Sequence, residues 1–190
     1  MDRRQRIANA GIALIARGGT HRLTHRAVDT EAGLPNGSTS YYARSRRDLI
    51  RLVMEQLSAE SQADLTDIEV PGKLTVRQAT DLVGRLAERL ILNGDAQAAR
   101  FALMFEVRDD DELRRELTVD APVRRSFDEK AVELLRALGV ADPEEKAPGF
   151  VALVDAVLMY RAVDAAPIDP AGVVETYLDG LVRRKPTAAL

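Results

Sequence analysis

Apolar residues recur at helical spacing along most of this 190-residue chain, and this pattern constrains the fold more than any other feature. The clearest stripe lies between about Thr75 and Leu92 and consists of Val76, Ala79, Val83, Leu86, Ala87 and Leu90. No segment shows convincing alternation of apolar and polar residues, as a half-buried β-strand would. The sequence therefore predicts an all-α protein.

The composition is that of an ordinary folded chain, with 46% hydrophobic and 30% charged residues. The absence of cysteine excludes disulfide frameworks, cysteine nucleophiles, iron–sulfur clusters and cysteine-rich zinc sites. The longest nearly apolar stretch, Phe150 to Tyr160, is about half as long as the ~20 residues that a membrane-spanning helix needs. We therefore expect a cytoplasmic protein with no membrane anchor.

Charge is distributed unevenly along the chain. Residues 1–50 contain nine arginines and four acidic residues, a net charge of +5, whereas residues 51–190 carry a net charge of −8. The formal net charge of −3 for the whole chain hides this contrast. Because an acidic body is repelled by a polyanion, only the first fifty residues are suited to contact one.

The first fifty residues predict a compact series of helices. After a first helix, a second starts at the N-cap Thr24 and ends at Gly33, which suits the left-handed position that follows a helix. A tight connection over residues 34–37 leads to a short polar helix over residues 38–42. The capping box Ser45-Arg46-Arg47-Asp48 then opens a long helix. Two short helices around a glycine turn are the layout of a DNA-reading helix-turn-helix.

Two other interpretations compete for this segment. Asn36-Gly37 is a strong β-hairpin signal, but no alternating apolar strand flanks the dipeptide. The arginines could also form an ordinary solvated basic face, with Tyr41 and Tyr42 covering a small core. The charge pattern taken alone does not decide between that face and a DNA-binding surface.

The polar side chains around the third helix offer donors and acceptors to base edges in a major groove. Neighbouring arginines and helix ends offer contacts to phosphates, which position a protein on DNA without reading its sequence. The candidate DNA-binding residues are Thr24, His25, Arg26, Asn36, Gly37, Ser38, Thr39, Ser40, Tyr41, Tyr42, Arg44 and Arg46.

Several short motifs are spaced along residues 4–50. They are the opening Arg4-Gln5-Arg6-Ile7-Ala8-Asn9-Ala10, Leu23-Thr24, Glu31-Ala32-Gly33-Leu34, Asn36-Gly37-Ser38, Tyr41-Tyr42 and Ser45-Arg46-Arg47-Asp48-Leu49-Ile50. With these motifs, which align without a gap, the first quarter of the chain resembles the TetR (tetracycline repressor-like) family of transcriptional regulators. The resemblance implies an all-α homodimer, with three N-terminal helices on DNA and a C-terminal helical body that binds a small ligand.

By position, the resemblance implies that Tyr42 and Arg46 contact phosphates, that Thr24 caps the second helix against the DNA backbone, and that residues 36–41 face the groove. The chain departs from the family at two positions. Ala43 stands where phenylalanine is usual, which would loosen the packing of the third helix under the first. Ser40 stands where an aromatic residue is common, which changes the groove chemistry, so the operator cannot be inferred from a relative.

We expect a helix-turn-helix DNA-binding domain over residues 1–47 and a helical ligand-binding and dimerisation domain over residues 48–190. In the second, Pro122 is expected to kink or split a helix, and Asp109 to Glu112 favour a helix N-terminus over a metal site. Soft and aromatic residues there suit the wall of a small-molecule cavity, with plain core packing as the alternative for each. The candidates are Phe101, Met104, Phe105, Phe127, Met159 and Tyr160. Asp155 is the candidate polar anchor, and its alternatives are a salt bridge to Arg161 or a position facing the dimer axis.

The last two helices, expected over about residues 149–163 and 171–184, carry more apolar surface than one neighbour can bury. This surplus favours a two-fold, four-helix interface between two copies of the chain. The candidate interface residues are Val173, Val174, Tyr177, Leu178 and Leu181. A homodimer would match a palindromic double-stranded DNA operator, whose half-sites lie ~34–36 Å or a multiple of this apart.

The sequence offers little for catalysis. The two histidines, His21 and His25, both lie in the basic segment, and no phosphate-binding loop, dinucleotide-binding fingerprint or nucleophile elbow is present. We therefore expect no enzymatic activity, no metal and no cofactor. The prediction is a ligand-responsive transcriptional regulator, a repressor that an unknown small-molecule effector releases from DNA. The alternative is a helical ligand-binding or protein-docking module without DNA binding, whose interactions would not depend steeply on salt.

Overall fold

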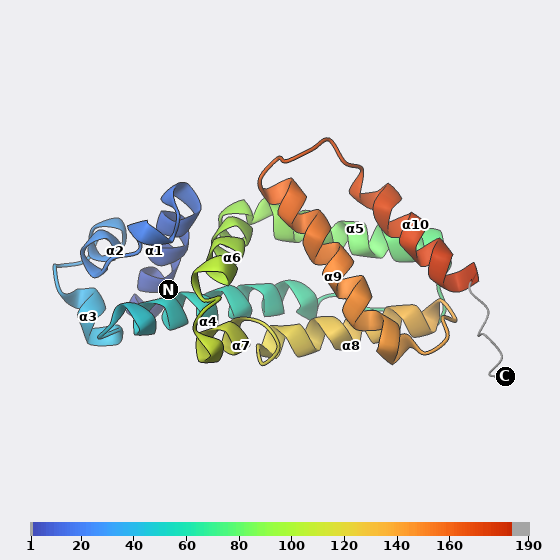
Figure 1. The fold of residues 1–190 in the computed structure, drawn as a ribbon, viewed down its shortest axis with the longest axis horizontal. Coiled ribbons are helices and arrows are strands. Elements are labelled where there is room, and N and C mark those ends of the chain that lie inside the picture. Colours follow the sequence, from blue (N-terminus) through green and yellow to red (C-terminus); the bar gives the residue numbers. More distant parts are fainter. Residues whose placement is uncertain (1, 184–190) are drawn as a thin grey trace. The chain divides into compact units, whose positions relative to one another are not determined.

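The computed structural model describes residues 2–183, and within that range every regular element is helical, which confirms the all-α prediction (Figure 1). In chain order the elements are α1 (Arg3–Gly18), the 3₁₀ helix η1 (Thr20–Arg22), α2 (His25–Glu31), α3 (Ser38–Tyr42), α4 (Arg46–Thr66), α5 (Val76–Leu92), α6 (Gly94–Glu106), α7 (Asp111–Leu117), α8 (Pro122–Ala137), α9 (Pro143–Ala162) and α10 (Pro170–Arg183). None of the described helices is both long and apolar enough to cross a bilayer.

The helices pack into two compact units, each with its own core. Within the described residues, the first unit contains residues 2–62 and 93–123, and the second contains residues 63–92 and 124–183. Packing thus places α6 and α7 in one unit with the N-terminal helices. The functional division at residue 47 stays a prediction.

In the first unit, α1 lies against α2, η1 and α6 (Figure 1). Its inward face contributes Ile7 and Ile15 to the core, at 0% and 2% exposed. A β-carbon added at Gly11 would lie 2.5 Å from Cγ2 of Val53, so only glycine lets α1 approach α4 this closely. Ala43 is 1% exposed in the same core, so the small residue at this position is fully packed.

In the second unit, α5 lies beside α9 and α10 (Figure 1). Leu135 and Leu178 are fully buried at its centre. The ring of Phe150 on α9 stacks on that of Tyr177 on α10, with centroids 6.0 Å apart and planes 20° from parallel. These contacts fix the last two helices against one another and against α5.

Most predicted helix boundaries are confirmed, and one prediction is wrong. The capping box is present, because the Ser45 amide donates to Asp48 Oδ2 at 3.0 Å and the Asp48 amide donates to Ser45 Oγ at 3.1 Å. Pro122 does not kink or split a helix but opens α8, since the first turn needs no amide hydrogen at that position. The helix α9 begins six residues before the predicted start, and the predicted end of the last helix, Arg184, lies outside the described residues.

Candidate nucleic-acid interface

The connection between α2 and α3 is built around one buried carboxylate, that of Asp29, which is 1% exposed. Its Oδ2 accepts a hydrogen bond from the Gly37 amide at 2.7 Å, and its Oδ1 accepts two from Thr39, from the amide at 2.7 Å and from Oγ1 at 2.6 Å. Gly37 adopts a φ of +91°, a left-handed conformation that a side chain would strain. The carboxylate thereby fixes both the turn and the first turn of α3.

The pKa of Asp29 follows from two opposing effects. Burial raises the pKa of the carboxyl, because it penalises the charged form, but the hydrogen bonds from Thr39 and Gly37 and the nearby His25 stabilise that form. The balance holds the pKa below its ordinary value. Asp29 is therefore an ionised, internally satisfied anchor at neutral pH.

The third helix presents a polar and aromatic surface to solvent. Asn36, Ser40 and Tyr41 are exposed, Tyr41 by 83%, and the rings of Tyr41 and Tyr42 meet edge-to-face with centroids 5.2 Å apart. Thr39 points the other way and is fully buried, with its hydroxyl committed to Asp29. Along this segment, residues that are exposed for contact with another molecule therefore alternate with residues that anchor the helix in the unit.

The start of α2 is tied to the end of α3. Thr24 caps α2 as predicted, because its Oγ1 accepts from the Ala27 amide at 3.2 Å. The His25 ring nitrogen Nε2 lies 2.8 Å from the carbonyl oxygen of Ala43 and donates to it, since a carbonyl can only accept. This bond occupies Nε2 of His25, which sequence analysis placed among the DNA-binding residues, and leaves Nδ1 outside the bond.

The arginines of residues 2–51 fall into two groups. The first group binds acceptors within the same unit. Arg4 pairs with Glu55, Arg17 pairs with Glu31, and Arg6 donates to the carbonyl oxygen of Ala32. Arg46, Arg47 and Arg51 of α4 form ion pairs with acidic residues of α6 and α7 or the turn between them. The other group is exposed, and its side chains have no hydrogen-bond or ion-pair partner within residues 2–183. Its members are Arg3, Arg22, Arg26 and Arg44.

A network of ion pairs joins the first turns of α4 to α7. Arg47 pairs with Asp110 and Glu112 at 2.8 Å, and Arg51 pairs with Glu112 at 2.9 Å and Glu116 at 2.8 Å. The guanidinium of Arg47 lowers the pKa of Asp110 to about 2. Part of the positive charge of residues 1–50 is thus neutralised within the unit. The helix end at Asp109 to Glu112 is also confirmed, because Asp110 caps α7.

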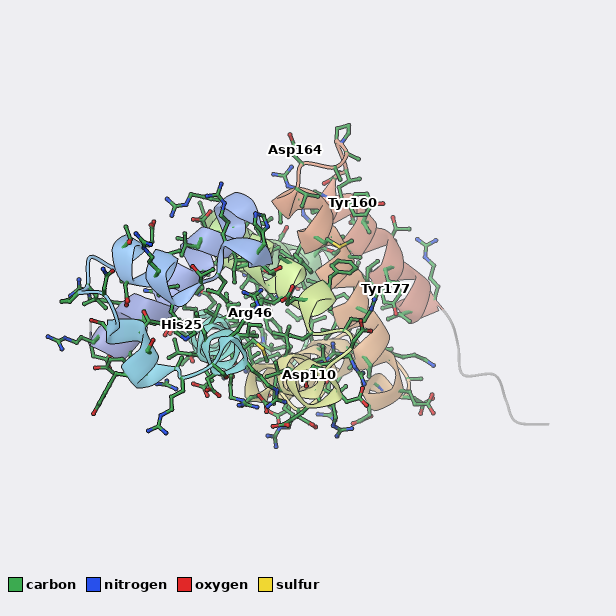
Figure 2. All side chains as sticks on the ribbon, turned by 60° about the vertical axis from the view of Figure 1, so that its left-hand side comes forward. His25, Arg46, Asp110, Tyr160, Asp164 and Tyr177 are labelled. Carbon is green, nitrogen blue, oxygen red and sulfur yellow. The ribbon has the colours of Figure 1, made fainter. Side chains whose placement is uncertain are left out.

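Arg46, which Figure 2 labels, makes three hydrogen bonds, two of them to backbone carbonyl oxygens. Its Nη1 donates to the carbonyl oxygen of Leu23 at 2.6 Å, and its Nη2 donates to that of Thr20 at 2.9 Å and to Glu106 Oε1 at 2.8 Å. The resemblance implied a phosphate contact at this position. In the structure the guanidinium bonds internal acceptors while the side chain stays 43% exposed, and the phosphate contact stays a prediction.

The second unit contains an apolar cavity of about 60 Å³. This is several times the ~10–15 Å³ that one water needs on the same measure. Its wall includes Phe127 and Asp155, two of the predicted residues, and Lys130 is its other charged member. The remaining lining residues are Leu65, Ile68, Val70, Leu82, Val83, Leu86, Ala131, Leu134, Phe150, Val151, Val154 and Leu158.

The other five predicted pocket residues lie elsewhere. Phe101, Met104 and Phe105 are on α6 in the first unit; Phe105 is 74% exposed, and the Arg100 guanidinium lies 4.3 Å from the Phe101 ring centroid. Met159 and Tyr160 are on α9 but do not line the cavity, and Tyr160 is 44% exposed (Figure 2).

The predicted interface residues of α10 divide between core and surface. Val174 and Leu178 are buried in the second unit, whereas Val173 is exposed and Tyr177 and Leu181 are half-buried. The small residues Ala152 and Ala156 of α9, which sequence analysis did not single out, are also exposed and lie two helical turns and one helical turn before Tyr160. Their i, i+4 spacing was the signal that could have found them.

Two residues of the DNA-binding candidate site were also missed. Arg22 stands two residues before Thr24, the cap of α2, with an exposed, unpaired side chain, and its basic charge near this cap was the available signal. Asp29 is one of four acids among nine arginines in residues 1–50, and its negative charge in this basic segment was the available signal for an internal anchor. Among residues 2–183, no group of histidine, aspartate and glutamate side chains could hold a metal ion.

Comparisons with known proteins agree with this geometry. The family described as "Tetracyclin repressor-like, C-terminal domain" matches residues 74–184. The fold is similar to that of a TetR-family member from Streptomyces coelicolor, at 24% identity and a TM-score of 0.68 over 95% of this chain and 98% of that one. It is also similar to a transcriptional regulator from Rhodococcus, at 14% identity and a TM-score of 0.78 over 96% and 97%.

A third similar structure is the multidrug binding protein EbrR complexed with proflavin, at 25% identity and a TM-score of 0.59 over 95% of this chain and 99% of that one. A search of curated proteins finds no match.

Proposed function

Because the chain belongs to the tetracycline repressor-like family of ligand-responsive, DNA-binding transcriptional regulators, we propose that it represses transcription as a homodimer on a palindromic DNA operator. One observation carries the proposal: the Asp29-anchored α2–α3 motif presents Asn36, Ser40 and Tyr41 beside arginines that have no internal partner. The exposed polar residues would read bases, and Tyr42, Arg22, Arg26 and Arg44 would contact phosphates.

Base-reading and phosphate-contacting residues are expected to respond differently to substitution. Asn36→Ala should relax sequence preference, at a cost of about 1–3 kcal/mol on the preferred site, and leave non-specific binding largely intact. Arg44→Ala should weaken binding to all duplexes and flatten the dependence of log K on log salt by about 0.9 per protomer. Titrations of both variants on a preferred and a shuffled duplex, followed by fluorescence anisotropy, measure these quantities.

The matched control is Arg4→Ala, which removes an arginine of the same unit that already pairs with Glu55. It should leave the salt dependence unchanged. If Asn36→Ala and Arg44→Ala both bound the preferred duplex like the parent protein, the proposed docking face would be wrong.

The homodimer surface is proposed to lie on α9 and α10. Ala152, Ala156 and Tyr160 form one exposed stripe of α9, and Val173 of α10 is also exposed. Small residues allow the helices of two protomers to approach closely, so a four-helix contact can bury a surface that one chain leaves exposed. Two-fold symmetry would then pair two docking faces with two operator half-sites.

We also propose that the effector binds in the apolar cavity of the second unit and is small, uncharged and mainly apolar. Two phenylalanines and aliphatic side chains make almost the whole wall. Its two charged residues already have partners, since Lys130 pairs with Glu133 at 2.9 Å and Asp155 also interacts within the chain. An unpaired charge on a ligand would lose its hydration there without a compensating partner. EbrR, which has been solved with proflavin and malachite green, supports small-molecule binding on this fold.

Benzyl alcohol and its charged analogues benzoate and benzylammonium test this class of ligand. We expect benzyl alcohol to raise the melting temperature and both ions to have no effect at the same concentration. Ala131→Leu should remove the effect by filling the cavity, whereas Glu129→Leu, which adds the same side chain at an exposed position of α8, should not. Stronger stabilisation by either ion would contradict an uncharged ligand.

A further inference from the structure

We propose that Arg46 is a positioning residue, which with Glu106 clamps the loop before α2 to the end of α6 and does not contact a DNA phosphate. The proposal deepens the proposed function, because it concerns how the DNA-binding motif is held. It rests on contacts within one compact unit, the one that contains η1, the start of α4 and all of α6.

The clamp is a closed cycle of hydrogen bonds. Arg46 donates to the carbonyl oxygens of Leu23 and Thr20 and to Glu106 Oε1, while Thr20 Oγ1 donates to Glu106 Oε2 at 2.7 Å. Both oxygens of the glutamate and both terminal nitrogens of the arginine are therefore engaged. A planar guanidinium can serve three acceptors in fixed directions, which a lysine ammonium on a flexible stem does less well.

Charge balance within the clamp argues against a phosphate contact. The Glu106 carboxylate neutralises Arg46, and the hydrogen bonds from Arg46 and Thr20 hold the pKa of Glu106 below its ordinary value. Three of the five guanidinium N–H donors of Arg46 are already engaged, so a phosphate could use only the remaining donors of this 43% exposed side chain, whose charge Glu106 balances. Arg22 and Arg44 are exposed without such partners and offer their charge with no bond to break.

The place of the clamp in the chain shows what it positions. Leu23 is 1% exposed and directly precedes Thr24, the cap of α2. Glu106 is the last residue of α6. By holding Thr20 and Leu23, Arg46 fixes the direction in which the chain enters α2, and therefore the orientation of α2 and the α3 that Asp29 attaches to it.

The test compares Arg46→Ala, Arg46→Lys and Glu106→Gln, with Arg47→Ala as the matched control that removes the neighbouring arginine of the same helix turn. The DNA probe is the duplex that the parent protein selects from a randomised pool. We expect Arg46→Ala and Glu106→Gln to weaken binding by about 10-fold or more, and the salt slope to stay at the parent value. Arg46→Lys should bind DNA as weakly as Arg46→Ala. The double variant Arg46→Ala/Glu106→Gln should bind no more weakly than Arg46→Ala alone, because both substitutions break the same clamp.

A phosphate contact predicts the opposite pattern. Arg46→Ala would then lower the salt slope by about 0.9 per protomer, Arg46→Lys would retain binding, and Glu106→Gln would leave affinity unchanged or raise it. Either of the first two results would overturn the clamp.

Amide hydrogen exchange tests the clamp without DNA, so its failure can be told apart from a failure of the proposed function. Exchange over residues 19–24 should accelerate in Arg46→Ala and Glu106→Gln but not in Arg47→Ala. Unchanged exchange in the first two variants would overturn the clamp even if the parent protein binds DNA. If exchange accelerated in these two variants but the parent protein selected no duplex, the clamp would be supported and the DNA function contradicted.

Discussion

Replacing Asp29 with alanine should abolish sequence-specific DNA binding, with a loss of affinity of about 100-fold or more. The substitution leaves three donors without their acceptor, the buried amide and hydroxyl of Thr39 and the part-buried amide of Gly37. Each buried donor left unpaired costs about 1–3 kcal/mol, so the free energy of unfolding of the first unit should fall by about 3 kcal/mol or more. Thermal unfolding and anisotropy titrations measure the two effects.

Two further variants separate the anchor from a general loss of charge. Asp29→Asn keeps the shape and one acceptor but turns a donor toward the Gly37 amide, so we expect an intermediate loss. Glu31→Ala removes an acid from the same helix that pairs with Arg17 at a partly exposed site, and it should change stability by less than about 1 kcal/mol. A parent-like Asp29→Ala would show that the turn is held by other contacts.

The pH dependence of the Asp29 effect has a definite sign. The folded state lowers the pKa of this carboxyl, so its stabilisation is fully present above the unfolded pKa of about 3.9 and is lost as the pH falls through the lower folded value. The stability difference between parent and Asp29→Asn should therefore be constant near neutrality and narrow only below about pH 4. A difference that narrowed between pH 8 and pH 6 would implicate another group.

The second large effect is expected from a charge placed on the proposed dimer surface. Ala156→Arg adds a long cation to the exposed small-residue stripe of α9. In a close helix–helix contact this charge would be buried without a partner, so the variant should be monomeric. A monomer loses the joint binding of two half-sites, and operator affinity should fall by about 100-fold or more. Sedimentation equilibrium and anisotropy measure these changes.

Glu129→Arg, an equally large cation at an exposed position of α8, is the control and should remain dimeric. The Ala156→Arg chain should keep its helical circular dichroism, because the site faces away from its own core. If this variant remained a dimer with parent affinity for DNA, the dimer surface would lie on other elements.

The helices could be predicted from the sequence because their signals are local. The N-cap at Thr24, the left-handed Gly33 and the capping box between Ser45 and Asp48 are each decided by a few neighbouring residues. The same local chemistry indicated the turn at Gly37. Pro122 was misjudged because proline breaks a helix interior but favours the first turn, and only the position of the helix start distinguishes the two.

The candidate site was less predictable because it depends on contacts between distant residues. The sequence shows Arg46 as one more cation, whereas its role depends on Glu106, sixty positions away. Thr39 fits a polar groove-facing helix by composition, but Asp29 binds it inside the unit. Spacing cannot distinguish the cavity residues Phe150 and Leu158 from core residues, because cavity-lining and core residues recur at the same helical spacing.

Fluorescence anisotropy of the purified chain most directly tests the central claim, that its N-terminal unit reads DNA as part of a dimer. The probes are a duplex selected from a randomised pool and its shuffled control, each at about 50 mM and 200 mM salt. With Arg22, Arg26 and Arg44 of each protomer on phosphates, six arginine–phosphate contacts per dimer predict a loss of affinity of about 10³-fold between the two salt concentrations, and tighter binding of the selected duplex. Equal binding of both duplexes with little salt dependence would contradict the account and favour a helical docking module without DNA binding.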